Sequence, residues 1–97
     1  MTNKFYKENK EEFKTLKQYI PVVSKVHGKN HPEFFQVENN FNSLYEKLTN
    51  EQFQDASLDE EFKNLREITN NYTVPEDVCE SYEEVYNLLE KLDKNYK

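Results

Sequence analysis

The sequence predicts an all-α protein that folds as an antiparallel, up-down four-helix bundle. Apolar residues recur at steps of three and four along four separate segments, which is the spacing of one side of a helix. Only one glycine and three prolines interrupt the 97 residues, and the β-branched residues are too scattered to form strand runs. Seven phenylalanines and seven tyrosines supply large side chains for a core. This length suits one domain over residues 1–97.

The first helix is expected to begin after Thr2 or Asn3, because either side chain can cap a helix N-terminus. Pro21 falls inside the helical pattern and has no backbone N–H to donate, so it should kink the helix or split it in two. The charged residues between the apolar positions form a solvated face. The apolar stripe consists of Phe13, Leu16, Ile20, Val23 and His27, with Phe5 and Tyr6 extending it at one end.

A turn is predicted at residues 27–32, between the first and second helices. Gly28 suits the left-handed position that ends a helix. Pro32 suits the first turn of the following helix, which places His31 near its N-cap. The second helix then carries the stripe Phe34, Val37, Phe41, Leu44 and Leu48, and its pattern fades after Thr49.

The third helix is expected to begin at a capping box and to end near Asn71. Ser57 and Glu60 have the spacing of that motif, a hydroxyl residue followed three positions later by glutamate. The polar residues 50–56 before it are interpreted as a loop or a frayed helix end. The stripe of the third helix is Leu58, Phe62, Leu65, Ile68 and Tyr72.

Pro75 marks the corner between the third and fourth helices, because it cannot donate a backbone hydrogen bond and disfavours helical geometry at Val74. The fourth helix is expected to start after Thr73, with Pro75 in its first turn. A start at Ser81 is the alternative, since Ser81 and Glu84 repeat the capping-box spacing. The stripe of the fourth helix is Val78, Tyr82, Val85, Leu89, Leu92 and Tyr96.

Charge and composition exclude several classes of protein. The formal net charge of −6 repels phosphate backbones, so nucleic acid is not an expected partner. No apolar stretch is long enough to span a bilayer and no signal peptide is recognisable, which favours a cytoplasmic location away from membranes. Cys79 is the single cysteine, so it has no internal disulfide partner. A small, buried or half-buried role is favoured for it, because neighbouring acidic residues oppose a reactive thiolate.

His27 and His31 are the candidate metal ligands, and they are the two histidines of the chain. Histidines four residues apart on a continuous helix can share a metal ion. Gly28 and Pro32 indicate that the helix is broken between them, and a metal site normally needs further ligands, with Glu33 the nearest carboxylate. The alternative is that His27 closes the core stripe and His31 caps the second helix. No catalytic or cofactor-binding motif is recognised.

Two segments resemble the RIC family, the repair-of-iron-centres proteins. Residues 16–34 read LKQYIPVVSKVHGKNHPEF, and residues 65–92 read LREITNNYTVPEDVCESYEEVYNLLEKL. Together they cover about half of the chain, in the order found in the family. The resemblance implies a hemerythrin-like four-helix bundle and a stress-response activity, the repair of iron–sulfur clusters damaged by oxidative or nitrosative stress. It also implies a non-haem di-iron centre held by histidine and glutamate.

The same resemblance implies that this chain lacks the iron ligands of the family. The family carries a segment resembling H-x-x-x-E late in its fourth helix, and this chain ends at Lys97 before that segment, so its fourth helix is expected to be shortened. The other ligand positions of the family align by spacing with Tyr6, Asn50 and Asp55. The turn that holds both histidines is expected at the opposite end of the bundle. No cofactor is therefore expected in this chain as given.

The sequence leaves three functional hypotheses open. In the first, a hemerythrin-like protein without its own di-iron centre serves iron–sulfur cluster repair as a scaffold, as a partner of a full-length relative, or by completing a site across a dimer. In the second, the chain is a metal-independent module that binds another protein through tyrosines and an acidic face. In the third, the chain is truncated and its ligands lie beyond Lys97. A shortened fourth helix would uncover part of the bundle groove, so self-association through the first and fourth helices is expected.

Overall fold

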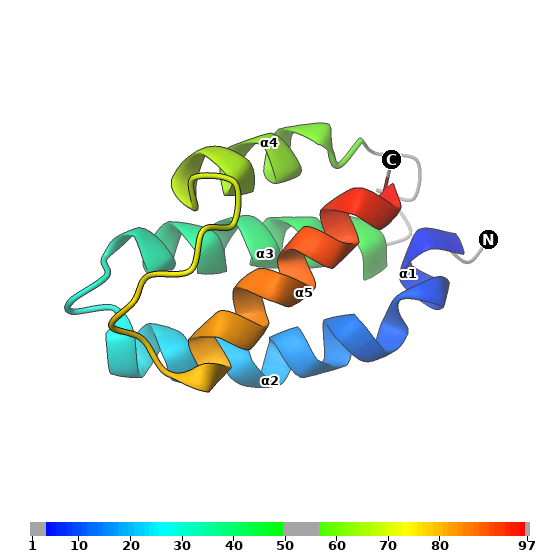
Figure 1. The fold of residues 1–97 in the computed structure, drawn as a ribbon. Coiled ribbons are helices and arrows are strands. Elements are labelled where there is room, and N and C mark those ends of the chain that lie inside the picture. Colours follow the sequence, from blue (N-terminus) through cyan, green and yellow to red (C-terminus); the bar gives the residue numbers. More distant parts are fainter. Residues whose placement is uncertain (1–3, 50–56, 97) are drawn as a thin grey trace.

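The computed structural model describes residues 4–49 and 57–96, and every regular element in these two ranges is a helix (Figure 1). This confirms the all-α prediction. The hemerythrin-like four-helix bundle stays a prediction. None of the five helices combines the length and the apolar character that crossing a bilayer requires. The helices are α1 (Lys4–Glu8), α2 (Lys10–His27), α3 (Glu33–Thr49), α4 (Asp59–Ile68) and α5 (Glu80–Tyr96).

The four longer helices are arranged so that consecutive ones run in opposite directions (Figure 1). Helix α2 packs against both α3 and α5, and α3 packs against α4. The short helix α1 packs against α2. The turn between α2 and α3 therefore lies at the same end of the molecule as the start of α5, and α1 lies at the other end (Figure 1).

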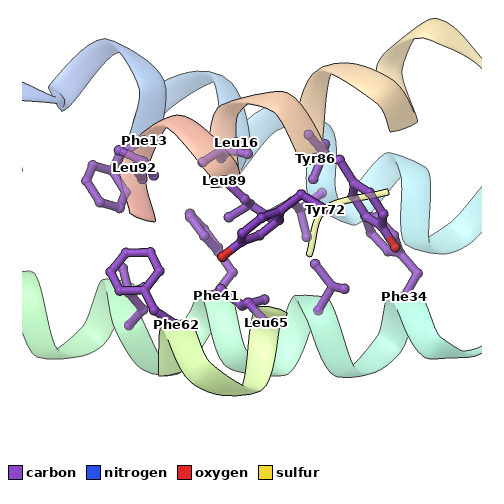
Figure 2. Packing of buried hydrophobic residues seen from close by; sticks show 14 of the residues in the cluster. Phe13, Leu16, Phe34, Phe41, Phe62, Leu65, Tyr72, Tyr86, Leu89 and Leu92 are labelled. Carbon is purple, nitrogen blue, oxygen red and sulfur yellow. The ribbon is translucent and has the colours of Figure 1, made fainter. Parts of the chain in front are cut away.

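The core is built mainly from the predicted apolar stripes, whose side chains point toward one another from all four longer helices (Figure 2). Tyr86 of α5 is also fully buried although it was in no predicted stripe, and Val78 lies before α5 and is half-buried. Burying each such side chain contributes about 1.5 to 3 kcal/mol before the loss of conformational entropy is subtracted. Spacing at three and four residues thus identified the inward face of every long helix. The largest fully buried side chains are Tyr82, Tyr86, Phe13, Phe34, Phe41 and Phe62.

The predicted first helix is interrupted at Asn9, which separates α1 from α2. Asn9 is buried, and its side-chain amide donates to the carbonyl oxygen of Phe5 at 2.8 Å. Its side-chain oxygen accepts a hydrogen bond from Asn95 of α5 at 2.9 Å. A contact between residues far apart in the sequence therefore stabilises the break between α1 and α2. Helix α2 continues through Pro21 without being split. A kink at Pro21 stays a prediction, and the expected caps Thr2 and Asn3 lie outside the described residues.

Gly28 follows α2 in a right-handed conformation, with φ −58° and ψ −30°, so the predicted left-handed position is wrong. Glycine is required at this position because there is no room for a side chain. A Cβ atom here would collide with the ring of Phe35 and with the carbonyl oxygen of Ser24. The absence of a side chain thus lets Phe35 lie against the backbone at the end of α2.

Helix α4 begins close to its predicted start, although the hydrogen bond there differs from a capping box. The hydroxyl of Ser57 accepts from the backbone N–H of Asp59 at 3.1 Å, two residues on instead of three. The N-cap residue is Leu58, whose own N–H donates to the hydroxyl of Tyr96 at 2.9 Å. The predicted loop at residues 50–56 lies outside the described residues.

Helix α4 ends at Ile68, earlier than the predicted end near Asn71. Asn70, Asn71 and Tyr72 have φ values of 52°, 58° and 63°, a left-handed turn that costs an ordinary residue about 1 to 2 kcal/mol and that asparagine tolerates better than most residues other than glycine. The hydroxyl of Thr69 holds this turn, because it accepts from the Tyr72 N–H at 2.8 Å and donates to a carbonyl oxygen of α4 at 2.6 Å.

Helix α5 begins at Glu80, so the prediction of a start after Thr73 with Pro75 in the first turn is wrong. Pro75 instead lies in the irregular connection between α4 and α5. The alternative start at Ser81 was one residue away from the observed one. The carbonyl oxygen of Cys79 accepts from the N–H of Glu83 at 3.2 Å, which places Cys79 directly before the first turn of α5.

The left-handed turn is tied to α5 by the buried carboxylate of Asp93. The hydroxyl of Tyr72 donates to Asp93 at 2.9 Å, and the Nη1 group of Arg66 donates to its two oxygens at 2.7 and 2.8 Å. Asp93 is only 4% exposed, so each of these hydrogen bonds stabilises a charge removed from water. The ring of Tyr72 is part of the apolar core (Figure 2).

We predict that Tyr72→Phe lowers the free energy of unfolding by about 1.5 to 3 kcal/mol, because a buried carboxylate loses one charged hydrogen bond while the ring stays in place. Urea denaturation followed by circular dichroism measures the change. Tyr19→Phe, at a half-buried tyrosine of α2, is the matched control and should change stability by less than about 0.5 kcal/mol. Equal effects of the two substitutions would contradict the role given to the Tyr72 hydroxyl.

Candidate functional site

Both candidate histidines lie where the turn between α2 and α3 meets the start of α5, and we call His27, His31, Asp77, Cys79 and Tyr82 the histidine cluster. Nε2 of His27 lies 3.1 Å from the Sγ atom of Cys79. Nε2 of His31 lies 3.1 Å from an oxygen of Asp77. The cluster thus joins residues from opposite halves of the sequence.

Tyr82 lies beneath both histidines and closes the cluster toward the core. The centre of its ring is 5.5 Å from the imidazole of His27 and 5.5 Å from that of His31, and both pairs meet edge to face. Tyr82 is completely buried, and its hydroxyl shares a hydrogen bond of 3.0 Å with Tyr86. Burial, and then this hydrogen bond, raises the pKa of Tyr82 far above its ordinary value, so the phenol stays neutral.

His31 is the histidine of the cluster whose pKa is shifted. Its Nδ1 atom lies 3.1 Å from a carboxylate oxygen of Glu33. Burial opposes the charged form, but the hydrogen bond with Glu33 and the charges of Asp77 and Glu33 together outweigh it and raise the pKa of His31 above 6.5. The backbone carbonyl of His31 accepts from the N–H of Phe34, so the residue also lies at the start of α3 as predicted.

Cys79 is exposed, so the expectation that it is buried or half-buried is wrong. It lies in the connection before α5 and outside the apolar stripe of that helix, which leaves its thiol at the surface beside His27. The contact joins residues 52 positions apart, and no pattern within either segment could have indicated it.

The histidine cluster does not assemble the ligands of a metal site. His31 is paired with the carboxylates of Glu33 and Asp77, whereas His27 faces Cys79. In the described ranges 4–49 and 57–96, no three His, Cys, Asp or Glu side chains come together in a set that could hold a metal ion. His27 and His31 remain ligand candidates without a third ligand in this part of the chain.

Aromatic side chains fill the opposite end of the molecule, and we call Phe5, Tyr6, Phe13, Tyr45 and Tyr96 the aromatic end. The ring of Phe5 lies 6.0 Å from Phe13 and 5.4 Å from Tyr96, both edge to face. The hydroxyls of Tyr6 and Tyr45 are 3.3 Å apart. These side chains come from α1, α2, α3 and α5, so the interior here is packed with rings.

The resemblance places a di-iron ligand at the position of Tyr6, which is in the aromatic end. Iron centres of that kind are held by histidine nitrogens and carboxylate oxygens, whereas the five side chains of the aromatic end are phenyl and phenol rings. The buried amide of Asn9 beside them is already hydrogen-bonded to Phe5 and Asn95. The described residues of this end therefore do not fit a di-iron centre. Asn50 and Asp55, at two further ligand positions, lie outside the described residues.

Comparison with known proteins gives one relationship over nearly the whole chain. The chain is similar to an iron-sulfur cluster repair protein. It is 26% identical over 123 residues to the iron-sulfur cluster repair protein ScdA of Staphylococcus haemolyticus (strain JCSC1435), and the match covers 95% of this chain. This similarity supports the resemblance to the RIC family. No family model matches the chain, and no solved structure matches it.

The chain spans 55% of the length of ScdA. The aligned stretch of 123 residues is longer than the 97 residues of this chain, so ScdA contains residues within that stretch that this chain lacks. The similarity therefore covers nearly all of this chain but little more than half of ScdA.

Sequence reasoning also missed the network of Arg66, Tyr72 and Asp93. One signal could have found it: Asp93 follows Leu89 by four residues, so a charged side chain occupies an inward position of the α5 stripe. A carboxylate at such a position requires a cationic or hydrogen-bonding partner. Which partner it takes depends on the turn after α4, and no periodicity reveals that turn.

We predict that His31 makes stability depend on pH above the range in which carboxylates titrate. Because the folded pKa is raised above 6.5, protonated His31 stabilises the fold at pH values below 6.5, and this contribution is lost as the pH rises through the folded pKa. The urea midpoint should be higher at about pH 6 than at about pH 8.

His31→Gln should remove most of that difference between the two pH values, whereas His27→Gln should retain it. The second variant is a matched control, since it removes the other imidazole of the same cluster. An unchanged pH dependence in His31→Gln would show that another group carries it.

Proposed function

We propose that this chain is a hemerythrin-like four-helix relative of iron–sulfur cluster repair proteins that works without a di-iron centre of its own. In this proposal it serves cluster repair as a scaffold or as a partner of a full-length relative. The similarity to ScdA over 95% of the chain supports the connection to cluster repair. The all-helical structure, with consecutive long helices running in opposite directions, agrees with the bundle (Figure 1).

The observation that carries the proposal is the packing of the aromatic end. A di-iron centre needs a polar set of ligands inside the bundle, and Phe5, Phe13 and Tyr96 occupy the interior there. The hydroxyls of Tyr6 and Tyr45 already share a hydrogen bond with each other. Replacing metal ligands by such rings keeps the helices packed while it removes the chemistry of the metal, because rings restore the buried apolar area.

The alternative function is a metal-independent protein-interaction module, and one feature of the surface favours it. Val22 and Val26 of α2 are 58% and 64% exposed, and Phe35 of α3 is 47% exposed. The two valines are one helical turn apart and lie on the same face of α2. Exposed apolar side chains that gather on one face are typical of partner surfaces. Self-association through α2 and α5, the first and fourth long helices, stays part of this proposal.

We predict that the chain, expressed with added iron and purified, contains far less than one iron per chain and lacks the near-ultraviolet absorbance of an oxo-bridged pair. The reason is that the described donors do not fit a di-iron centre. Elemental analysis and absorbance spectroscopy measure this. A full-length RIC family protein prepared in the same way is the positive control. Stoichiometric iron in this chain would contradict the proposal.

Cluster repair itself is tested by the recovery of an enzyme whose iron–sulfur cluster has been damaged by peroxide. We expect no recovery with this chain alone, and a faster recovery with ScdA and this chain together than with ScdA alone. Bovine serum albumin at equal mass controls for non-specific protection. Equal rates with and without this chain would reject the role of a partner in repair.

The hypothesis of an interaction module leads to a separate prediction. The double variant Val22→Gln and Val26→Gln should weaken binding to ScdA, or to a second copy of the chain, by at least about tenfold, because the apolar area lost is worth more than about 1.4 kcal/mol. Lys25→Gln, at an exposed site of the same helix, is the control. Light scattering and surface plasmon resonance give the assembly state and the affinity. Unchanged binding in the double variant would exclude this surface.

A further inference from the structure

Two rows of side chains meet on the surface where α2 packs against α5. Tyr19, Val22 and Val26 follow one another at steps of three and four, so they share one face of α2. Glu80 and Glu84 are one helical turn apart and share one face of α5. We call this surface the α2–α5 seam, and it consists of Tyr19, Val22, Val26, Glu80, Ser81 and Glu84.

A hollow in the surface shows that the two rows face each other. It measures about 160 Å³ and lies between Tyr19 of α2 and three residues of α5, which are Glu80, Ser81 and Glu84. The α2 row continues beside it toward the start of α5, because His27 and Cys79, the chain neighbours of Val26 and Glu80, lie 3.1 Å apart. The seam therefore joins a small polar hollow to the exposed strip of valines.

The charges of α2 and α5 are paired at one end of their contact and not at the other. Glu12 of α2 forms an ion pair with Lys91 of α5 at 2.8 Å. Tyr19 stands two helical turns after Glu12, and Glu84 stands two turns before Lys91. Within the ranges 4–49 and 57–96, neither Glu80 nor Glu84 takes part in an ion pair. Acidic groups without a cation thus face an apolar row of α2.

We propose that the seam binds a cationic amphipathic helix of another protein. Lysine or arginine side chains of that helix pair with Glu80 and Glu84, and its apolar side chains cover Val22 and Val26. This inference rests on the interaction module proposed above, and it names the kind of partner that the module binds.

The size of the hollow excludes a small-molecule ligand and suits the end of one cationic side chain. Pockets for drug-sized ligands measure about 300 to 1,000 Å³, and this hollow is smaller. A volume of 160 Å³ is that of a few water molecules, which an ammonium or guanidinium group can replace. The hydroxyls of Tyr19 and Ser81 border the hollow and supply acceptor oxygens beside the two carboxylates.

The spacing of the valines and the charge of the molecule favour a cationic helix over a second copy of this chain. Val22 and Val26 are 58% and 64% exposed and stand one helical turn apart, which is the spacing at which a helix presents its own apolar side chains. A second copy carries the same formal net charge of −6, so the two copies repel each other, whereas a cationic helix is attracted before it makes contact.

The test is titration of labelled synthetic peptides with the full chain, followed by fluorescence anisotropy. The first probe is an alanine-based helical peptide of about 15 residues with leucines on one face and lysines beside them. The second has glutamate in place of each lysine, and the third has glutamine in place of each leucine. The lysine peptide should bind most tightly, the glutamine peptide more weakly, and the glutamate peptide not at all.

Raising the ionic strength from about 0.01 M to about 0.15 M shortens the screening length from about 30 Å to about 8 Å and should weaken binding of the lysine peptide. Equal affinity for the lysine and glutamate peptides would overturn the assignment of a cationic partner. The absence of binding by the lysine peptide would overturn the proposal.

Two double variants separate a local site from a general effect of net charge. Glu80→Gln with Glu84→Gln, inside the seam, should weaken binding of the lysine peptide by at least about fivefold. Glu60→Gln with Glu67→Gln makes the same change in net charge at exposed sites of α4 and should leave the affinity within about twofold. All four side chains are exposed, so both variants are expected to fold. Equal losses in the two variants would overturn the proposal.

Failure of this inference is distinguishable from failure of the interaction module. If Val22→Gln with Val26→Gln weakens binding to ScdA while the lysine and glutamate peptides bind alike, the module is supported and the cationic partner is rejected. If light scattering shows a dimer of the chain that Glu80→Gln with Glu84→Gln leaves intact and that the lysine peptide does not dissociate, a second copy occupies the surface and the inference is overturned.

Discussion

The buried carboxylate of Asp93 is the interaction on which the arrangement of the last two helices depends. It stands on α5 and takes hydrogen bonds from Arg66 at the end of α4 and from Tyr72 in the left-handed turn. A charge in a low-dielectric interior is tolerated only when its partners are in place, so the position of each partner is fixed by the others. This fixes where α4 stops and how the chain turns toward the other end of the molecule. The histidine cluster exists because that turn brings the residues before α5 to the α2–α3 end.

The apolar periodicity predicted most of the fold, and the wrong predictions lie at helix ends, which are set by individual hydrogen bonds and turns that periodicity does not reveal. The inward faces of all four long helices were predictable, because each stripe repeats at helical spacing over several turns. The break at Asn9 was not, since it depends on a contact with Asn95. The early end of α4 depends on the hydroxyl of Thr69. Pro75 correctly marked the connection between α4 and α5, but it lies before α5 and not in the first turn of that helix.

The candidate site was predictable only in part, because its contacts join residues far apart in the sequence. His27 and His31 could be singled out as the histidine pair of the chain, but their partners come from the connection before α5. The resemblance aligned Tyr6 with a ligand position of the family, and in the structure the rings of Phe13 and Tyr45 lie against it. Similarity to ScdA extends over 95% of the chain, whereas the described residues do not reproduce the donors expected of the family. A scaffold can persist while the chemistry placed on it changes, because packing needs apolar area and catalysis needs particular atoms.

The connection between α4 and α5 has one further consequence. It is irregular, and Thr73, Glu76 and Asp77 along it are exposed, so a protease can reach it. The helix that follows is held against α2 by its buried stripe and not by the continuity of the backbone. Cleavage at this connection is therefore expected to leave the two fragments associated, so that a synthetic peptide corresponding to α5, 17 residues long, could be exchanged for the natural helix.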